Sequence, residues 1–391
     1  MGDALWADGR GFILLAVSFG WFLTLGVRIV YPALLPDIMT EFRMDYTGAG
    51  FLLSAIWVSY AIIQFPGGLL ADRFGERAIV LTSTVATLGA IVLIMVSPIF
   101  FVFAVATVVL GLGAGLYGTS RVTILSDVYP DNRTTAVSFS QMSGNVGNAV
   151  LPVIAGFVAV GFGWRMGFGY LIPLFLLVIV GIAIYVPERT SAAPEDGIGL
   201  AYVRNLANAV ATRSVIFASL MLFFFMFFYQ GITGFLPSYL IEVKGFSQTA
   251  AATVFGAFFV TAIVTQLFSG VVADRIGERR AIVLWVLVSL PGLVLLPFVE
   301  AAWLVVPVAL LCATVLGAIP PSHTYTVQLL PDALQGSGYG LVRTAYIGLA
   351  ATAPPIVGYI ADVGYFRYVF FLFAAVTVSA MMMCLRMPQV D

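Results

Sequence analysis

The chain has 391 residues, of which 61% are hydrophobic and only 9% are charged, against about 25% charged residues in soluble domains. This composition predicts an integral membrane protein that contacts the lipid bilayer. The net charge of −1 excludes nucleic acid as a partner, because phosphate binding needs a clustered excess of Lys and Arg. Two separate cysteines and one histidine form no metal-ligand cluster, so we expect neither a metal nor a cofactor.

Apolar runs of about 20 residues, the length that crosses a bilayer as a helix, predict an all-α protein with twelve transmembrane helices. The predicted spans are 11–35, 48–71, 78–97, 100–126, 134–160, 166–186, 214–240, 248–273, 281–299, 301–329, 337–361 and 365–386. The long polar stretch 187–213 is expected to be a cytoplasmic linker between two six-helix bundles, 1–186 and 214–391, with an interfacial helix near 198–210.

Basic residues predict the orientation of these spans in the membrane. With both termini cytoplasmic, eleven basic residues fall on the inside and four on the outside, namely Arg43, Arg165, Lys244 and Arg367. Cytoplasmic loops of membrane proteins carry the excess of Lys and Arg. We therefore expect a multi-pass protein of the cell membrane with both termini in the cytoplasm.

One segment of the chain occurs twice. "QFPGGLLADRFGERAIVL" at 64–81 recurs as "QLFSGVVADRIGERRAIVL" at 266–284, and Asp72 and Gly75 lie 202 positions before Asp274 and Gly277. Each copy follows the second span of its half, which predicts two halves in the same orientation related by a pseudo-two-fold axis. Such a parallel repeat is typical of a carrier whose substrate site lies between its halves.

The repeated segment also carries a family resemblance. "GGLLADRFGER" resembles the signature loop of the major facilitator superfamily, and "GLGAGLYG", "GNVGNAVLPVIAG" and "YQGITGFLPSYL" extend the resemblance over essentially the whole chain. The resemblance implies the fold of that family and a conformational latch between helices 2 and 11. Alternatively, the loop charges only cap helices and satisfy the positive-inside rule. The residues assigned to the latch are Gly68, Asp72, Arg73, Gly75, Arg77, Asp127, Asp274 and Arg275.

Three arginines lie inside apolar spans: Arg28, Arg121 and Arg343. Arg28 is eight residues from Pro36 and Arg121 nine from Pro130, which places both about 12 Å or more from a helix end. Every Asp and Glu lies at a span end, in a loop or in a tail. Because buried charges are usually compensated, we expect an anionic substrate to meet Arg28 and Arg121.

A structural role is the alternative for each of these arginines. Arg28 and Arg121 could instead donate to carbonyl groups of a neighbouring helix. Arg343 follows a short loop closely enough for its side chain to reach the membrane surface, so its structural role is at least as well supported as a role in binding.

A narrower resemblance concerns helix 4. "YGTSRVTILSDVYP" is similar to that helix in the organic-anion branch of the family, the anion:cation symporters. It implies that Arg28 and Arg121 clasp a carboxylate and that Tyr60 donates a hydrogen bond to it.

The repeat predicts what faces these arginines from the second half. Tyr229 or Gln230 corresponds to Arg28, and Ser322 or His323 to Arg121. These neutral groups, with Asn145 and Asn148, are further candidates for the substrate site. His323 titrates near neutral pH when solvated and could couple a proton to transport. The alternative, which we favour, is a neutral imidazole bonded to a backbone carbonyl.

Helix 5 carries glycines at 144, 147 and 156 with Pro152. They are related to a motif of proton-coupled drug antiporters, but small residues at helical spacing also permit close helix packing. We favour packing.

These observations predict a secondary active transporter for a small carboxylate-like anion, working by alternating access. Transport would be proton-coupled symport or exchange with a counter-anion. The alternative is an efflux antiporter for drugs or other metabolites, and a ligand sensor is a third, less favoured reading. The chain has no G-x-x-x-x-G-K-[ST] loop, which excludes an ATP-driven pump of that type. We expect no enzyme activity and a monomeric protein.

Overall fold

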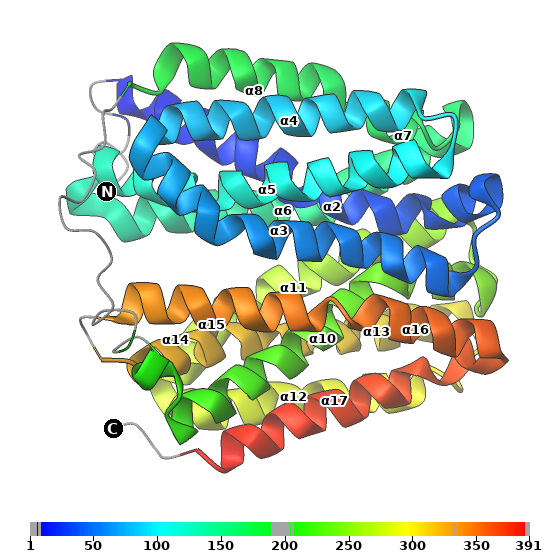
Figure 1. Cartoon of the computed structure of the whole chain (residues 1–391). Coiled ribbons are helices and arrows are strands. Elements are labelled where there is room, and N and C mark those ends of the chain that lie inside the picture. Colours follow the sequence, from blue (N-terminus) through cyan, green and yellow to red (C-terminus); the bar gives the residue numbers. More distant parts are fainter. Residues whose placement is uncertain (1–5, 7–8, 189–203, 205–206, 332–333, 388–391) are drawn as a thin grey trace. The chain divides into compact units, whose positions relative to one another are not determined.

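The computed structural model describes residues 6, 9–188, 204, 207–331 and 334–387. The chain divides into two compact units (Figure 1). Unit 1 comprises 1–44 and 52–195, and unit 2 comprises 45–51 and 196–391. Most of the predicted interfacial helix near 198–210 lies outside the described residues, which include only 204 and 207–210 of it.

Unit 1 is built from six membrane-length helical segments. They are α2 (Arg10–Phe42), α3 (Tyr46–Phe74), α4 (Glu76–Val96), α5 (Phe100–Val128), α6 (Arg133–Phe162) and the pair α7 (Met166–Gly169) and α8 (Leu171–Tyr185). The predicted span 11–35 ended too early, because α2 continues through Pro32 and Pro36 to Phe42. A membrane helix tolerates proline where neighbouring groups satisfy the freed backbone atoms.

Unit 2 repeats this order with more interruptions. Its helices are α10 (Arg213–Glu242), α11 (Gln248–Ile276), α12 (Glu278–Leu295), α13 (Ala302–Ala313), α14 (Ile319–Gln328), α15 (Gln335–Ala350), α16 (Ala353–Ile360) and α17 (Val369–Leu385). The predicted span 301–329 is not one regular helix, because a 3-10 segment, Thr314–Ala318, separates α13 from α14 just before Pro320 and Pro321. Each of these prolines lacks a backbone N–H, and its ring clashes with the carbonyl four residues earlier, here that of Leu316 and of Gly317.

Within the described residues, ten helical segments are long and apolar enough to cross a membrane. The difference from twelve has two physical causes. The stretch Ser337–Leu385 is a single segment in this count, although the chain reverses within it at Gly364, whose φ is 85°. In addition, α12 is only 18 residues long and begins with three charged residues, Glu278, Arg279 and Arg280. Its uncharged part is therefore too short to count as a membrane-length apolar segment.

The sequence repeat is also a structural repeat. Gly75 (φ 82°) and Gly277 (φ 85°) both adopt a left-handed conformation in the turns that follow α3 and α11, which a side chain would strain. Arg77 Nη2 donates to the carbonyl of Ala183, at 2.6 Å, and Arg279 Nη2 donates to the carbonyl of Leu385. Donor and acceptor are each shifted by 202 positions, so equivalent arginines of the repeat bind the end of the sixth helix in the two units.

Unit 2 includes the first turn of α3. The backbone N–H groups of Tyr46 and Thr47 donate to the Asp362 carboxylate at 2.9 and 2.8 Å. A Cβ on Gly358 would lie 2.1 Å from the Tyr46 carbonyl oxygen, so α16 and the start of α3 are in close backbone contact. The Asp362 carboxylate therefore caps a helix N-terminus, where negative charge is favourable.

Candidate functional site

Arg28 lies in the interior of unit 1 against two aromatic rings. It sits on α2, its residue is only 5% exposed, and its guanidinium carbon lies 4.4 Å from the ring centre of Tyr60 and 4.9 Å from that of Trp57. Both rings belong to α3. Cation–π contacts of this kind stabilise a cation at low water content by about 2 kcal/mol without neutralising its charge.

Arg121, on α5, has a similar environment to that of Arg28. It is also 5% exposed, and its guanidinium carbon lies 4.1 Å from the ring centre of Trp21 on α2. Nη1 donates to Ser140 Oγ at 3.0 Å, and Nη2 donates to Gln141 Oε1 at 2.6 Å. These partners on α6 are neutral, so they orient the guanidinium but leave its charge in place.

The helices around both arginines are short of negative charge. Arg28 and Arg121 are the only charged residues in the stretches 11–36, 46–71, 100–126 and 134–162. These stretches make up most of α2, α3, α5 and α6. These stretches of unit 1 therefore carry two permanent positive charges and no carboxylate, because a guanidinium stays protonated in proteins.

Asn145 and Asn148 lie on the same helix as the partners of Arg121. Gln141 Nε2 donates to Asn145 Oδ1 at 3.5 Å, which joins Asn145 to the Arg121 cluster. Asn148 is 4% exposed, and its Oδ1 has no hydrogen-bond partner among the described residues. Of the predicted site, unit 1 thus brings Arg28 to Tyr60 and Arg121 to Asn145, with Asn148 one turn further along α6.

In unit 2, His323 occupies the position that the 202-residue repeat assigns to Arg121. Its Nε2 lies 3.5 Å from the hydroxyl of Tyr346 on α15, so its described contact is with a side chain and not with the backbone carbonyl we expected. Arg343, half-buried one turn before Tyr346, lies near enough for its charge to act on the imidazole. In unit 2, the nearby cation, Arg343, therefore lies on α15, which corresponds to α6 of unit 1, whereas Arg121 lies on α5.

Gln230 and Tyr229 take the place of Arg28 in unit 2. Gln230 is completely buried, and its Nε2 donates to the carbonyl of Ile347 at 3.1 Å. Tyr229 is half-buried and packs edge-on against Phe259, with ring centres 6.5 Å apart. The mid-helix position that is cationic in α2 is thus neutral in α10.

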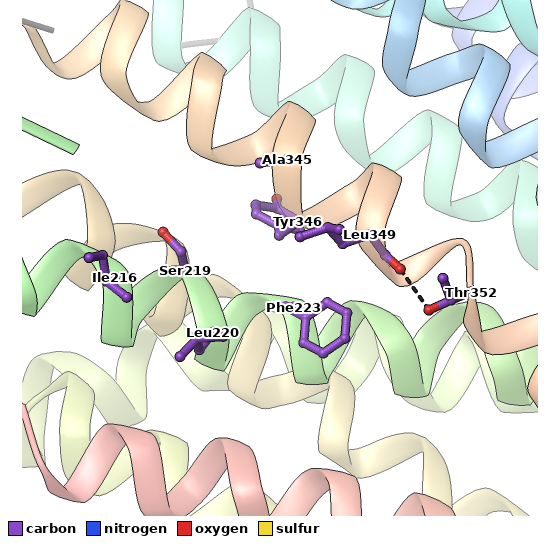
Figure 2. A pocket seen from close by; sticks show the side chains of 8 residues that line it. All are labelled: Ile216, Ser219, Leu220, Phe223, Ala345, Tyr346, Leu349 and Thr352. Atoms are coloured by element: carbon purple, nitrogen blue, oxygen red, sulfur yellow. Dashed lines mark hydrogen bonds between the residues drawn. The ribbon is translucent and has the colours of Figure 1, made fainter. Parts of the chain in front are cut away.

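A cavity of about 400 Å³ lies between α10 and α15 of unit 2 (Figure 2). No charged side chain lines this cavity, and Tyr346 contributes the polar group nearest to His323. It is therefore an apolar cavity beside the His323 cluster and not an anion site. Its lining residues are Ile216, Ser219, Leu220, Phe223, Ala345, Tyr346, Leu349 and Thr352.

The residues predicted to form the latch lie at helix ends. Asp72, Arg73 and Asp127 are exposed in unit 1, as are Asp274 and Arg275 in unit 2. The described partners of the Arg77 guanidinium are Glu188 Oε1, at 2.8 Å, and the Ala183 carbonyl, so Arg77 fastens α8 within its own unit. A Cβ on Gly68 would meet nothing within 4 Å, so the position is open.

Sequence reasoning missed four residues of this site. Trp21, Trp57, Ser140 and Gln141 hold the two guanidinium groups. One signal was available for Trp21, which lies seven residues before Arg28 and hence on the same helix face.

Comparisons with known proteins agree with this architecture. The family model "Major Facilitator Superfamily" matches residues 16–346 and 245–390. The cis,cis-muconate transport protein of Acinetobacter baylyi is 25% identical over 378 residues, covering 92% of this chain and 86% of that protein. The drug efflux pump JefA of Mycobacterium tuberculosis is 32% identical over 178 residues, covering 43% of this chain and 34% of that pump.

A solved structure of similar fold is the D-xylose-proton symporter. It superimposes with a TM-score of 0.78 over 97% of this chain and 98% of the symporter, at 17% sequence identity. Its likeness supports the all-α fold alone, and the named relatives are transporters and not enzymes. With the repeated signature loop and the family model spanning most of its length, the chain belongs to the Major Facilitator Superfamily.

Proposed function

We propose that this chain is a secondary transporter for a small organic anion and that Arg28 and Arg121 bind its negative charge. The observation that carries the proposal is the pair of buried guanidinium groups in a bundle interior without acidic residues. A carboxylate accepts two parallel hydrogen bonds from a guanidinium, and the bond is strengthened by charge. Similarity to a muconate transport protein over most of the chain also supports an organic-anion substrate.

In this proposal the substrate offsets an electrostatic cost. Burial of a guanidinium away from water costs several kcal/mol, and the aromatic faces of Tyr60, Trp57 and Trp21 return only part of it. A bound carboxylate compensates the charge, so the loaded transporter closes around its substrate more readily than the empty one. Alternating access then follows from relative movement of the two bundles, 1–186 and 214–391, joined by the linker 187–213. The signature-loop charges Asp72 and Arg73 would act as the latch, and a proton or a counter-anion would drive transport.

We further propose that the protein is a monomer in the cell membrane. Its termini are proposed to be cytoplasmic, an orientation that the distribution of basic residues favours.

A thermal-shift screen of the purified protein tests the proposal, because a ligand that binds only the folded state raises Tm. Carboxylates should raise Tm by several degrees, more than matched phosphates or sulfonates. Arg28→Gln and Arg121→Gln should each abolish the shift. Arg133→Gln, which removes an exposed arginine at the start of α6, is the matched control and should keep it. The unliganded Tm and the elution profile of each variant show whether it is folded.

Arg121→Lys adds a second measurement for the case in which the glutamine variants are unstable. Lysine keeps the charge but lacks the planar fork that contacts Trp21, Ser140 and Gln141 together. We expect a reduced shift with this variant. Normal shifts in Arg28→Gln and Arg121→Gln would show that the arginines are structural.

Drug efflux is the second candidate function, because a drug efflux pump is 32% identical over 178 residues. Carriers of cationic compounds need a negative charge at the site, and the stretches that surround Arg28 and Arg121 have none. Efflux of a fluorescent cation that survives Arg121→Gln would favour this candidate over anion transport.

A further inference from the structure

Helix α2 contributes to both cation sites of unit 1, because it carries Arg28 and also Trp21, the ring under Arg121. Trp21 and Arg28 are seven residues apart, which is two helical turns and about 10 Å along the axis. The Arg121 guanidinium lies over the Trp21 ring, with its carbon 4.1 Å from the ring centre. The Arg121 guanidinium is therefore held by α2 at Trp21, and α2 itself carries Arg28 two turns further along the chain.

The aromatic rings that hold these cations approach each other at a single glycine. A Cβ on Gly118 of α5 would lie 3.4 Å from both the Trp21 ring and the Tyr60 hydroxyl. Trp21 contacts Arg121, and Tyr60 contacts Arg28. The two cation sites thus share one wall and belong to one compartment of the unit.

Two buried polar atoms of unit 1 lie on the same helices as this compartment. Thr24, 1% exposed, is on α2 between Trp21 and Arg28, and its Oγ1 has no hydrogen-bond partner among the described residues. Asn148 Oδ1 is also buried and has no hydrogen-bond partner among the described residues. Asn148 lies on α6 between Gly144, where a Cβ would meet Trp21, and Leu151, which contacts Gly26. A buried polar group without a partner is costly, so both atoms point to a polar ligand at this depth.

We infer that the site takes a dianion, and specifically a linear dicarboxylate with one carboxylate at Arg28 and the other at Arg121. This inference rests on the proposed function and narrows its substrate class. The two guanidinium groups lie on different rings, Arg28 on Tyr60 and Arg121 on Trp21, so each takes one carboxylate of the ligand, and dicarboxylates of two chain lengths probe their separation. The Thr24 hydroxyl can donate a further hydrogen bond to a ligand carboxylate.

The decisive test compares ligands of equal length and different charge on the wild-type protein. Adipate and monomethyl adipate differ by one charge, as do suberate and monomethyl suberate. Quenching of tryptophan fluorescence reports binding, since Trp21 and Trp57 contact the two guanidinium groups. Each dianion should bind at least tenfold more tightly than its monomethyl ester. This comparison needs no variant, so it holds even where a variant fails to fold.

Two variants then assign the two carboxylates. In Arg28→Gln and in Arg121→Gln, adipate should bind no more than threefold more tightly than its ester, because only one cation remains. Arg133→Gln should keep the full preference. Suppose that the wild type binds adipate and monomethyl adipate equally well, and that binding is still lost on Arg28→Gln. This result overturns the dianion inference and leaves the proposed function intact. Failure of every carboxylate to bind overturns both.

Discussion

The packing of α2 on α6 in unit 1 differs from that of α10 on α15 in unit 2, although the pairs are equivalent in the repeat. In unit 1, a Cβ on Gly147 would lie 2.1 Å from the carbonyl oxygen of Phe22, and one on Gly144 would lie 2.5 Å from the Trp21 indole. In unit 2, the residues 202 positions later are Leu349 and Tyr346. They line the cavity of about 400 Å³.

In unit 1, this close packing accompanies the buried cation pair. Glycines on α6 let α2 approach closely and seat the Trp21 ring over Arg121. At the corresponding positions, α15 carries the larger side chains of Tyr346 and Leu349, which line the cavity. The glycines of helix 5 are thus packing residues, as favoured from the sequence, and their packing positions a guanidinium.

The largest effect is expected from filling the close contact of unit 1. Gly147→Ala places a methyl group against backbone and should destabilise the protein by about 3 kcal/mol, at the upper end for overpacking. At the equivalent position of unit 2, Leu349→Ala truncates a side chain that is 61% exposed and should cost about 0.5 kcal/mol or less. Thermal unfolding in detergent measures both, and equal losses would refute the asymmetry.

A second effect separates the units at their helix caps. Asp362 of unit 2 accepts from two backbone N–H groups of α3, whereas its counterpart in unit 1 is Val160. Asp362→Ala should lower stability by about 1 to 2 kcal/mol, as for other lost helix caps. Asp131→Ala, an exposed carboxylate, is the control and should change the unfolding temperature little.

The third prediction concerns a feature that the units share. Arg77→Gln and Arg279→Gln each remove a hydrogen bond to a carbonyl at the end of the sixth helix. Each also removes a second bond, from Arg77 to the Glu188 carboxylate or from Arg279 to the Met387 carbonyl. We expect similar losses of about 1 to 2 kcal/mol, since one such bond contributes about 1 kcal/mol and an exposed ion pair little. A large loss in one variant and none in the other would mean that the repeat is not equivalent at this position.

The smallest effect tests the ring under Arg121. Trp21→Phe keeps an aromatic face but weakens the cation–π contact, for which indole is best, so carboxylate affinity should fall about threefold. The equivalent residue in unit 2 is Phe223, and Phe223→Leu should leave carboxylate affinity unchanged. A greater loss from Phe223→Leu than from Trp21→Phe would move the anion site away from unit 1.

Some of this account could be predicted from the sequence because it depends on local patterns. The length of apolar runs predicted the all-α membrane fold, and the repeated signature loop predicted the offset that relates Arg77 to Arg279. Arg28 and Arg121 were identifiable because a charge in an apolar run is rare.

The rest depends on contacts between distant residues. Nothing near Arg121 in the chain indicates that Trp21, a hundred residues earlier, supplies its aromatic face. The cap that Asp362 provides for Tyr46 spans 316 positions. The interruption before α14 was missed because the apolar stretch that precedes Pro320 is by itself long enough to suggest a span, although proline should have marked the break.

Uptake of labelled adipate into proteoliposomes tests most directly whether the buried arginines of unit 1 bind a transported organic anion. Wild-type protein and Arg133→Gln should both carry adipate, and Arg28→Gln and Arg121→Gln should carry it at the rate of protein-free liposomes. Wild-type rates in folded Arg28→Gln and Arg121→Gln would contradict the account.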